Sequence, residues 1–492
     1  MSIADGITRR YAEGSLVKTK IVATLGPASA SPERLQELLQ AGVDVFRINF
    51  AHGEYEWYAT VVNAIREAAA AIHRPVGILG DLSGPKIRLG ELPPEGLRCR
   101  QDAIIKFVRE PQPDHPEHLT CTYSPLIDDL RPGDRVLLAD GSVALRVQST
   151  DVEIGEAVCV VEQPGLIRSR QGVNLPGVAL STPAITDKDR DDLAWALDHQ
   201  LDFIGLSFVR SSADIRHLRK LITEHGTTTP PWIIAKIEKT EAIADLENIL
   251  DETDAVMVAR GDLGVEADIT RVPTMQKRII RLCNERRLPV ITATQMLDSM
   301  QKNELPTRAE VSDVANAILD GTDAVMLSGE TAIGEHPVTT VAMMSRIAQD
   351  AERLLEPRQG PDLHPTSRSR ATVITEAITA GAGTAAAKLG ADLIAVATRG
   401  GKTAMALSRQ RLGVPILALT DRPDIARRLT LCWGVIPEDT TAVALAPSEL
   451  LAYVERRGKE LDLLDSGSKL VLVGNSKWDH EWHDMCLAHV VS

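Results

Sequence analysis

Eight short apolar segments, most of them ending in polar residues, constrain the possible folds more than any other feature of the sequence. They cover residues 21–25, 43–50, 76–82, 203–209, 233–238, 255–259, 289–294 and 324–327. Eight parallel strands with intervening helices close into a (β/α)8 TIM barrel, an α/β fold whose functional residues gather at the carboxyl ends of the strands. An open, doubly wound sheet is the alternative. The count of eight, and the polar residues at nearly every strand end, favour the barrel.

The alternation of strand and helix is interrupted once, between residues 87 and 174. Segments 104–108, 135–138, 143–147 and 157–161 have the period of strands, and turn residues such as Pro132-Gly133-Asp134 separate them. We therefore expect a β-rich domain at 87–174, inserted into a catalytic barrel formed by residues 1–86 and 175–350.

A third unit, residues 351–492, follows the barrel. After a polar linker, a helix is expected at 372–389 and strands at 393–397, 415–419 and 469–473, which indicates an open-sheet α/β domain. The tail from Asp479 to His483, with Cys486 and His489, contains several metal-binding residue types. Its spacing matches no ligand pattern, so a polar terminal segment is the better interpretation.

Composition limits the possible partners. The net charge is −14 and there is no basic tract, which argues against a nucleic-acid-binding protein, because such proteins need a positive surface for phosphates. The six cysteines lie far apart, without metal-finger or redox spacing, and indicate free thiols. No segment has the length of a membrane span. We expect a soluble, cytoplasmic protein with no membrane partner.

Two of the apolar segments carry the strongest chemical signal. One ends in Arg260-Gly261-Asp262, and the other ends in Lys236-Ile237-Glu238. Side chains alternate along a strand, so Lys236 and Glu238 share a face and can meet Asp262 at the barrel mouth. An ammonium with two carboxylates suits a hard divalent metal that holds an oxyanion. A structural ion pair at the barrel rim is the alternative.

Long motifs from about residue 18 to the C-terminus resemble those of the pyruvate kinase family. They are TKIVATLGPAS (19–29), VFRINFAHG (45–53), GDLSGPKIR (80–88), IIAKIE (233–238), MVARGDLGVE (257–266), ITATQMLDSM (291–300) and the stretch 306–332. The resemblance implies a barrel, an inserted β lid, a C-terminal effector domain and a homotetramer. It also implies phosphoryl transfer from phosphoenolpyruvate to ADP, giving pyruvate and ATP, the final step of glycolysis.

On the substrate side, the resemblance gives roles to five residues. Lys236 would neutralise the transferring phosphoryl group, and Glu238 and Asp262 would hold Mg²⁺ or Mn²⁺. The amides of Gly261 and Asp262, with the Thr294 hydroxyl, would bind the substrate carboxylate. Thr294 would also lie in the proton path to the enolate, where a water is an alternative donor. The simpler interpretation of Thr294 is a helix-capping residue.

The phosphoryl and nucleotide side would involve Arg47, Asn49, His52 and Arg88. Arg47 would bind the transferring phosphoryl group, and the other three would contact the nucleotide. A buried salt bridge is the alternative for Arg47, and an ordinary helix-start histidine for His52. The chain departs from the family at Gln171, where a lysine that reaches the nucleotide phosphates is usual. Arg170 is a possible replacement for that lysine.

A second departure concerns potassium. The positions that hold K⁺ in many family members are here Asn49, Ala51, Asp81 and Leu82, and Ala51 has no side-chain oxygen. A glutamate is common where this chain has Lys86, whose ammonium is a tethered monovalent cation. We therefore expect Lys86, with Asp81, to replace K⁺ and the enzyme to be potassium-independent. A solvated hinge lysine is the alternative.

The loop from Thr398 to Thr403 precedes a helix in the C-terminal unit and contains Arg399, Gly400 and Lys402. Backbone amides at a helix start favour anions. By resemblance, this loop would bind the phosphate of an allosteric sugar phosphate or nucleotide. An ordinary strand-to-helix connection is the alternative.

Two other functions fit parts of the pattern. One is a lyase or mutase that handles phosphoenolpyruvate on a barrel with Mg²⁺. The inserted domain and the C-terminal unit argue against it. The other is a regulatory homologue that binds metabolites without turnover. It is less favoured, because the chain retains Lys236, Glu238, Asp262, Thr294 and Arg47.

Overall fold

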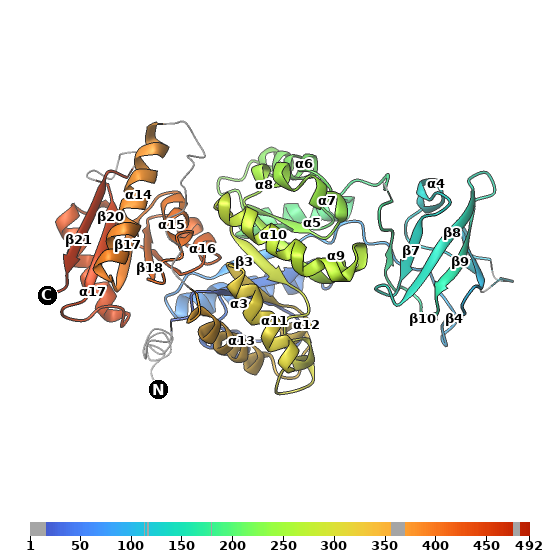
Figure 1. Ribbon diagram of the computed structural model, residues 1–492, viewed down its shortest axis with the longest axis horizontal. Coiled ribbons are helices and arrows are strands. Elements are labelled where there is room, and N and C mark those ends of the chain that lie inside the picture. The colour runs from blue at the N-terminus through green and yellow to red at the C-terminus, as the bar shows by residue number, and fades with distance from the viewer. Residues whose placement is uncertain (1–15, 113, 116–117, 179, 356–369, 476–482) are drawn as a thin grey trace.

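The computed structural model describes residues 16–112, 114–115, 118–178, 180–355, 370–475 and 483–492. Three units lie along the long axis of the molecule (Figure 1). A barrel occupies the centre, the inserted β-rich unit lies at one end, and the C-terminal unit lies at the other. The two outer units therefore contact opposite sides of the barrel.

The central unit is a closed barrel of eight parallel strands. In barrel order they are β1 (Lys20–Thr24), β2 (Val45–Asn49), β3 (Gly77–Asp81), β12 (Phe203–Leu206), β13 (Trp232–Ile237), β14 (Ala255–Ala259), β15 (Val290–Ala293) and β16 (Ala324–Leu327), which pairs back with β1. Each strand coincides with or overlaps one of the eight apolar segments. The prediction of a (β/α)8 barrel is confirmed.

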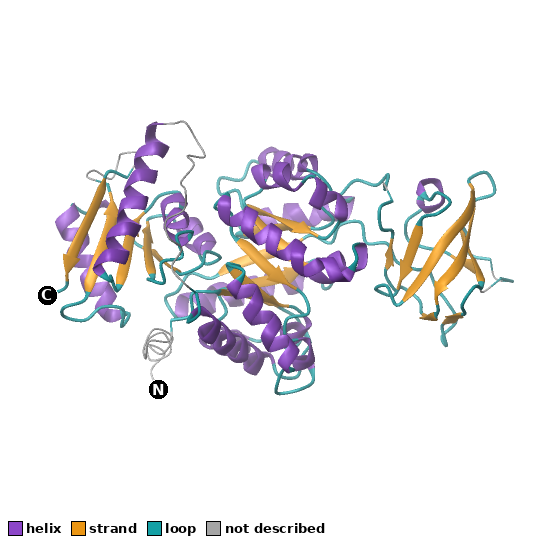
Figure 2. Ribbon diagram, in the orientation of Figure 1, coloured by secondary structure: helices purple, strands orange, loops and turns teal. Residues whose placement is uncertain are grey.

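Helices surround the strands of the barrel (Figure 2). They are α2 (Pro32–Ala41), α3 (Tyr55–Ala71), α5 (Asp187–Asp198), α6 (Ser212–His225), α7 (Thr240–Ala244), α8 (Leu246–Glu252), α9 (Arg260–Glu266), α10 (Val272–Glu285), α11 (Arg308–Leu319), α12 (Gly329–Ala332) and α13 (Pro337–Glu352). Several of these helices begin at residues whose side chains cap the first turn. Ser31 accepts a hydrogen bond from the Arg34 amide at 3.2 Å, and Pro32 occupies the first turn of α2.

Both faces of the barrel strands are buried, as expected of a parallel sheet covered by helices. Side chains such as Val22, Leu79, Ile234 and Met257 fill the barrel interior, whereas the alternate residues pack under the helices. Burying an aliphatic side chain of this kind contributes about 1.5–3 kcal/mol. The scarcity of aromatic residues is therefore compatible with a large aliphatic core.

Four buried or half-buried aspartates organise the amino-terminal end of the barrel. Asp44, Asp202, Asp254 and Asp323 each precede a strand and accept the amide of a residue in the preceding strand, at 2.9–3.0 Å. The C-terminal unit binds two of them, through Arg427 to Asp202 at 2.7 Å and Arg409 to Asp323 at 2.6 Å. These contacts attach the C-terminal unit to the end of the barrel opposite the strand ends that carry the predicted site.

The inserted unit is a curled antiparallel sheet with one short parallel pairing and a small separate ribbon. The sheet order is β11 (Val173–Asn174), β7 (Arg135–Leu138), β8 (Val143–Asp151), β9 (Glu156–Gln163), β5 (Ile104–Val108) and β6 (His118–Leu119). The ribbon pairs β10 (Gly165–Ile167) with β4 (Leu97–Cys99), and α4 (Leu126–Asp129) covers one end. All four predicted strand segments form strands.

The C-terminal unit is a five-stranded α/β sheet in the order β19 (Val435–Asp439), β18 (Ile416–Thr420), β17 (Leu393–Ala397), β20 (Lys469–Gly474) and β21 (Met485–Val490). Its helices are α14 (Arg370–Leu389), α15 (Lys402–Ser408), α16 (Pro423–Leu429) and α17 (Pro447–Glu460). The sequence did not predict β19 or the antiparallel edge strand β21, so Cys486 and His489 belong to a strand. Residues 479–482 of the tail lie outside the described part. No helix within the described ranges is long and apolar enough to cross a membrane.

Candidate active site

Lys236, at the carboxyl end of β13, is the centre of a buried ion cluster. Its ammonium lies 2.9 Å from Glu238 Oε1 and 3.3 Å from Asp81 Oδ1, and it donates to Ser207 Oγ at 2.7 Å. The Lys236 side chain is 11% exposed, and the two carboxylates are 2% exposed or less. The prediction that Lys236 and Glu238 share a face is confirmed by this contact. Such a poised, nearly dry cation can interact strongly with an anionic ligand.

Arg47 extends the cluster across the neighbouring strand. Its Nε and Nη2 lie 2.7 and 2.6 Å from Asp81 Oδ2, and its Nη1 donates to Thr24 Oγ1 at 3.0 Å. Gly205 on β12 makes room for this carboxylate, because a Cβ there would lie 2.9 Å from Asp81 Oδ1. Arg47 thus forms the buried salt bridge considered as its alternative role, next to Lys236.

The cluster shifts the pKa values of its members in different directions. Burial alone would raise the pKa of Asp81, but Lys236 and Arg47 hold it below its usual value. Burial alone would lower the pKa of Lys236, but Asp81 and Glu238 raise it. Burial raises the pKa of Glu238 despite Lys236, and Asp262 adds to the rise. Ionisation of Glu238 in the folded protein therefore costs free energy, and a further cation near its carboxylate would reduce that cost.

Glu238 and Asp262 are the carboxylates available to a divalent metal. Glu238 Oε2 accepts the Phe208 amide at 2.8 Å, which orients the carboxylate. Within the described ranges, no three His, Cys, Asp or Glu side chains form a metal-binding group. Mg²⁺ is commonly held by one or two carboxylates, with water and substrate oxygens completing its shell.

Thr294 follows β15 beside the start of α9. Its hydroxyl accepts the Gly261 amide at 2.8 Å and donates to the Ala293 carbonyl at 2.6 Å. Thr294 and Gln295 have φ angles of +67° and +53°, which are unusual for residues with side chains. Residues 260–266 form the short helix α9, so the hydrogen bond between Gly261 and Thr294 joins the start of α9 to the turn after β15.

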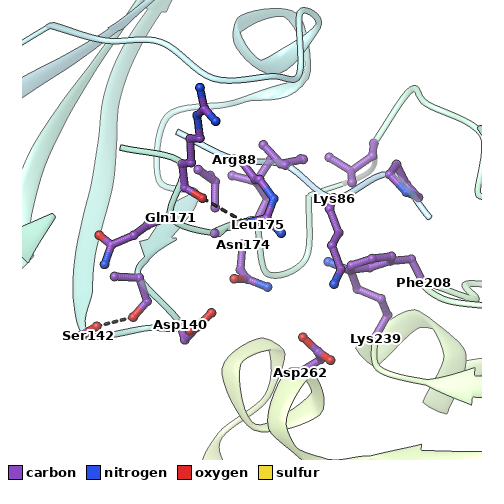
Figure 3. Close-up of a pocket in the computed structure, with 17 residues that line it drawn as sticks. Lys86, Arg88, Asp140, Ser142, Gln171, Asn174, Leu175, Phe208, Lys239 and Asp262 are labelled. Carbon is purple, nitrogen blue, oxygen red and sulfur yellow. Dashed lines mark hydrogen bonds between the residues drawn. The ribbon is translucent and has the colours of Figure 1, made fainter. Parts of the chain in front are cut away.

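A cavity of about 630 Å³ separates the barrel mouth from the inserted unit. Asp262, Phe208 and Lys239 line it from the barrel, and Lys86 and Arg88 line it from the connection to the inserted unit (Figure 3). The inserted unit contributes Asp140, Ser142, Arg170, Gln171 and Asn174. The cavity has room for a ligand of nucleotide size, and charged side chains line it on several sides.

Lys86 is exposed as a residue, but its ammonium is electrostatically coupled to the cluster. Burial of the ammonium and the charge of Lys236 lower the pKa of Lys86, while Asp262, Asp81 and Glu238 oppose that change. The three carboxylates of the site therefore favour the charged form of Lys86, but burial and Lys236 outweigh them.

Of the predicted nucleotide-side residues, Arg88 lines this cavity, whereas Asn49 and His52 are not among its lining residues. Asn49 Oδ1 accepts the Ala51 amide at 3.1 Å and shapes the turn that carries His52. Burial, followed by Lys86, Arg88 and Arg47, lowers the pKa of the His52 imidazole. Arg88 Nη1 donates to the Arg170 carbonyl at 3.1 Å.

Gln171 and Arg170 lie at the cavity but have partners of their own. Gln171 Oε1 accepts the Arg168 amide at 2.7 Å, and Arg170 Nε lies 2.8 Å from Glu91. Replacement of the missing lysine by Arg170 would require this exposed ion pair to open.

The predicted effector loop belongs to the C-terminal unit and is separate from this cluster. Thr398 Oγ1 accepts the Gly401 amide at 3.1 Å, which shapes the loop, and Thr403 Oγ1 lies 3.0 Å from His483 Nδ1. Arg399, Gly400 and Lys402 are exposed. The tail residue His483 therefore contacts the first turn of α15.

Several residues of the site were not singled out from the sequence. Ser207 and Phe208 follow β12, Arg260 follows β14, and Lys239 pairs with Glu266. Their positions directly after apolar strands were the available signal. Their partners come from other strands, so only the tertiary structure identifies their contacts.

The chain matches two family models, "Pyruvate kinase, barrel domain" over residues 16–341 and "Pyruvate kinase, alpha/beta domain" over residues 376–486. It is 43% identical over 426 residues to a pyruvate kinase of Geobacillus stearothermophilus, covering 87% of this chain and 72% of that protein. It is 41% identical over 470 residues to that of Corynebacterium efficiens, covering 94% and 97%.

A crystal structure of a pyruvate kinase from Cryptosporidium parvum matches with a TM-score of 0.88 and 35% identity, covering 99% of each chain. The barrel, its ion cluster and these similarities define a phosphotransferase. The chain belongs to the pyruvate kinase family, whose members use phosphoenolpyruvate and ADP and need a divalent metal.

Proposed function

We propose that the cluster around Lys236 transfers the phosphoryl group of phosphoenolpyruvate to ADP. The observation that carries this proposal is the Lys236 ammonium, held between Glu238 and Asp81 at the barrel mouth. Phosphoryl transfer depends mainly on positioning and on charge neutralisation. Lys236 neutralises the phosphoryl oxygens as charge develops, and Arg47 binds the same group by exchanging part of its contact with Asp81.

Glu238 and Asp262 hold the divalent metal, Mg²⁺ or Mn²⁺. When bound, this ion supplies neutralisation of phosphoryl charge and polarisation of the enolate oxygen. The Gly261 and Asp262 amides bind the substrate carboxylate together with Thr294, whose hydroxyl already contacts the Gly261 amide. Thr294 also holds the proton, directly or through a water, that the enolate of pyruvate receives.

The nucleotide occupies the cavity between the barrel and the inserted unit. Arg88, which lines the cavity, contacts its phosphate side. His52, which is not a lining residue of the cavity, reaches the phosphates from the turn that Asn49 shapes. The inserted unit, residues 87–174, acts as a lid over the catalytic barrel formed by residues 1–86 and 175–350.

Lys86 replaces a bound K⁺, so the enzyme is potassium-independent. Asp81, Glu238 and Asp262 favour the charge of Lys86 against the opposing effects of burial and Lys236, which supports this assignment. Ala51 offers no side-chain oxygen to an ion. An ammonium tethered to the chain supplies the same charge without depending on the salt concentration.

Regulation belongs to the C-terminal unit, residues 351–492. Thr398, Arg399, Gly400, Lys402 and Thr403 bind the phosphate of a sugar phosphate or nucleotide effector in a cytoplasmic homotetramer. The exposure of the Arg399 and Lys402 side chains is compatible with an anionic ligand.

The test is pyruvate formation from phosphoenolpyruvate and ADP with Mg²⁺, in buffer free of K⁺ and NH₄⁺ and then with KCl. We expect full activity without K⁺, and a Lys86→Glu variant that becomes slow until KCl is added. If the wild type is active only after KCl is added, the protein is still a kinase, but Lys86 does not replace K⁺. No turnover under either condition, with candidate effectors present, would favour a regulatory homologue.

A further inference from the structure

Thr294 and Gln295 form a turn with an unfavourable backbone conformation. Both have positive φ angles, +67° and +53°. A β-branched residue such as threonine rarely adopts the left-handed region, because its Cβ substituents crowd the backbone. Such a conformation persists only where the surrounding structure holds it, and it is typical of functional sites. The turn therefore needs a restraint from other parts of the structure. The position of the Thr294 hydroxyl depends on that restraint.

The side chain of Arg260 supplies that restraint. Its Nη2 donates to the Thr294 carbonyl at 2.8 Å and to the Gln295 carbonyl at 3.3 Å, and its Nε donates to the Ala293 carbonyl at 3.3 Å. The same Nη2 lies 2.8 Å from Met296 Sδ. One guanidinium thus contacts four consecutive residues of the segment from β15 through the turn.

Other elements fix the guanidinium from its opposite side. Asp313 on α11 lies 2.6 Å from Arg260 Nη1, and Gln276 on α10 accepts from the same nitrogen at 3.5 Å. Arg260 is 9% exposed, so its contacts with Gln276 and the Ala293 carbonyl operate with little screening by water. The Asp313 side chain is 42% exposed, so the ion pair is screened more. The planar fork of an arginine can reach three carbonyls and a carboxylate at once, whereas a lysine ammonium cannot.

Arg260 and Gly261 hold Thr294 from two directions. The side chain of Arg260 binds the Thr294 carbonyl, and the amide of the next residue, Gly261, donates to the Thr294 hydroxyl at 2.8 Å. The start of α9 therefore determines both the backbone and the hydroxyl position of Thr294. Since Asp262 follows immediately, any shift of this turn also changes the distance from the hydroxyl to the proposed metal ligand.

We infer that Arg260 is a positioning residue for enolate protonation, which holds the Thr294 hydroxyl in place beside the Gly261 amide without touching the substrate itself. This inference rests on the proposed role of Thr294 in the proton path. It separates two parts of the reaction. Phosphoryl transfer depends on Lys236 and the metal ligands, whereas proton delivery depends on a turn that Arg260 holds in place.

The experiment compares Arg260→Lys with the wild type. The charge is retained, but the fork that binds three carbonyls is lost. We expect kcat for pyruvate formation to fall by about 100-fold, the loss expected when a reacting group is misplaced by an ångström. Exchange of the methyl protons of pyruvate with deuterated solvent, followed by NMR with ATP and Mg²⁺ present, should slow by a similar factor. KM for ADP should remain unchanged.

Arg66→Lys is the matched control. Arg66 also binds two carbonyls, of Val76 and Gln200, and the carboxylate of Asp202, but at the amino-terminal end of the barrel. Asp313→Asn provides a milder variant, since it loosens the guanidinium without removing it. We expect Arg66→Lys to retain proton exchange and Asp313→Asn to give an intermediate loss. Equal losses of exchange in Arg66→Lys and Arg260→Lys would overturn the inference, because a general structural defect would then explain both.

Thr294→Ala distinguishes failure of the inference from failure of the proposed function. If Thr294→Ala slows proton exchange and Arg260→Lys does not, Arg260 is not a positioning residue. If Thr294→Ala exchanges protons at the wild-type rate, the role of Thr294 in the proton path is wrong, and the inference about Arg260 fails with it. Phosphoryl transfer by the Lys236 cluster would remain in place in either case.

Discussion

Arg47 and Asp81 form a buried ion pair across β2 and β3, in which Nε and Nη2 of the arginine lie 2.7 and 2.6 Å from a single carboxylate oxygen. The other oxygen of Asp81 faces Lys236. One carboxylate therefore separates two cations at the barrel mouth. Asp81 thereby holds Arg47 and Lys236 close together, where both can bind an anionic substrate.

Replacing Asp81 by asparagine should destabilise the protein by about 3–5 kcal/mol, because the change removes the charge that lies between the buried cations of Arg47 and Lys236. Glu238 then remains as the carboxylate that contacts Lys236. Urea unfolding monitored by tryptophan fluorescence measures this effect. A second change, Arg47→Met, should restore part of the lost stability, since it removes one of the two cations. Additive losses in the double variant would contradict the coupling.

The contribution of Asp81 to the free energy of unfolding should also depend on pH. Its pKa is lowered in the folded state from the ordinary value of 3.8. The folded protein therefore binds fewer protons than the unfolded chain, so the stabilisation is complete above about pH 5 and declines as the pH falls through 3.8 towards the folded-state pKa. The stability difference between the wild type and Asp81→Asn should be constant near neutral pH and shrink below pH 4. A difference that grows on acidification would contradict this sign.

Lys236→Met should lower kcat by about 10²–10³-fold, the usual loss when a group that stabilises transition-state charge is removed. Steady-state kinetics with saturating phosphoenolpyruvate and ADP measures it. Lys220→Met is a suitable control, because the Lys220 side chain is 70% exposed on α6 and pairs with the surface residue Glu224. Equal rates for the Lys236→Met variant and the wild type would exclude Lys236 from the reaction.

Glu238→Gln should stabilise the metal-free protein at pH 8. Burial raises the pKa of Glu238, so its ionisation costs stability as the pH rises through the folded-state pKa. Mg²⁺ should raise the melting temperature of the wild type more than that of Glu238→Gln, because only the wild type gains a cation for this carboxylate. Differential scanning fluorimetry with and without Mg²⁺ checks both expectations. An equal shift by Mg²⁺ in the two proteins would argue against Glu238 as a ligand.

Tyr58→Phe should raise KM for ADP and leave kcat nearly unchanged. The Tyr58 hydroxyl donates to the His52 carbonyl at 2.7 Å and holds the turn on the nucleotide side, and one such hydrogen bond contributes about 1 kcal/mol. Tyr453→Phe is the matched control, since Tyr453 binds Glu438 within the C-terminal unit. An unchanged KM for ADP would mean that the turn does not bind the nucleotide.

The sequence predicted most of the barrel because its elements carry local signals. Eight apolar segments match the eight strands, and residues such as Ser31 and Pro32 start a helix by contacts within one turn. The shared face of Lys236 and Glu238 follows from the period of a strand alone. In the C-terminal unit the same approach missed β19 and β21, since these strands are recognised mainly by their pairing with strands already present.

The sequence by itself therefore determined the order of strands and helices, the family motifs and the charged residues placed at the strand ends. Only the tertiary structure decided that Asp81 separates Arg47 from Lys236, and that Arg260 holds Thr294 in a left-handed conformation. The physical reason is the range of the interactions. Periodicity and capping act over a few residues, whereas these ion pairs and hydrogen bonds join residues that are distant in the chain and meet only when the barrel closes.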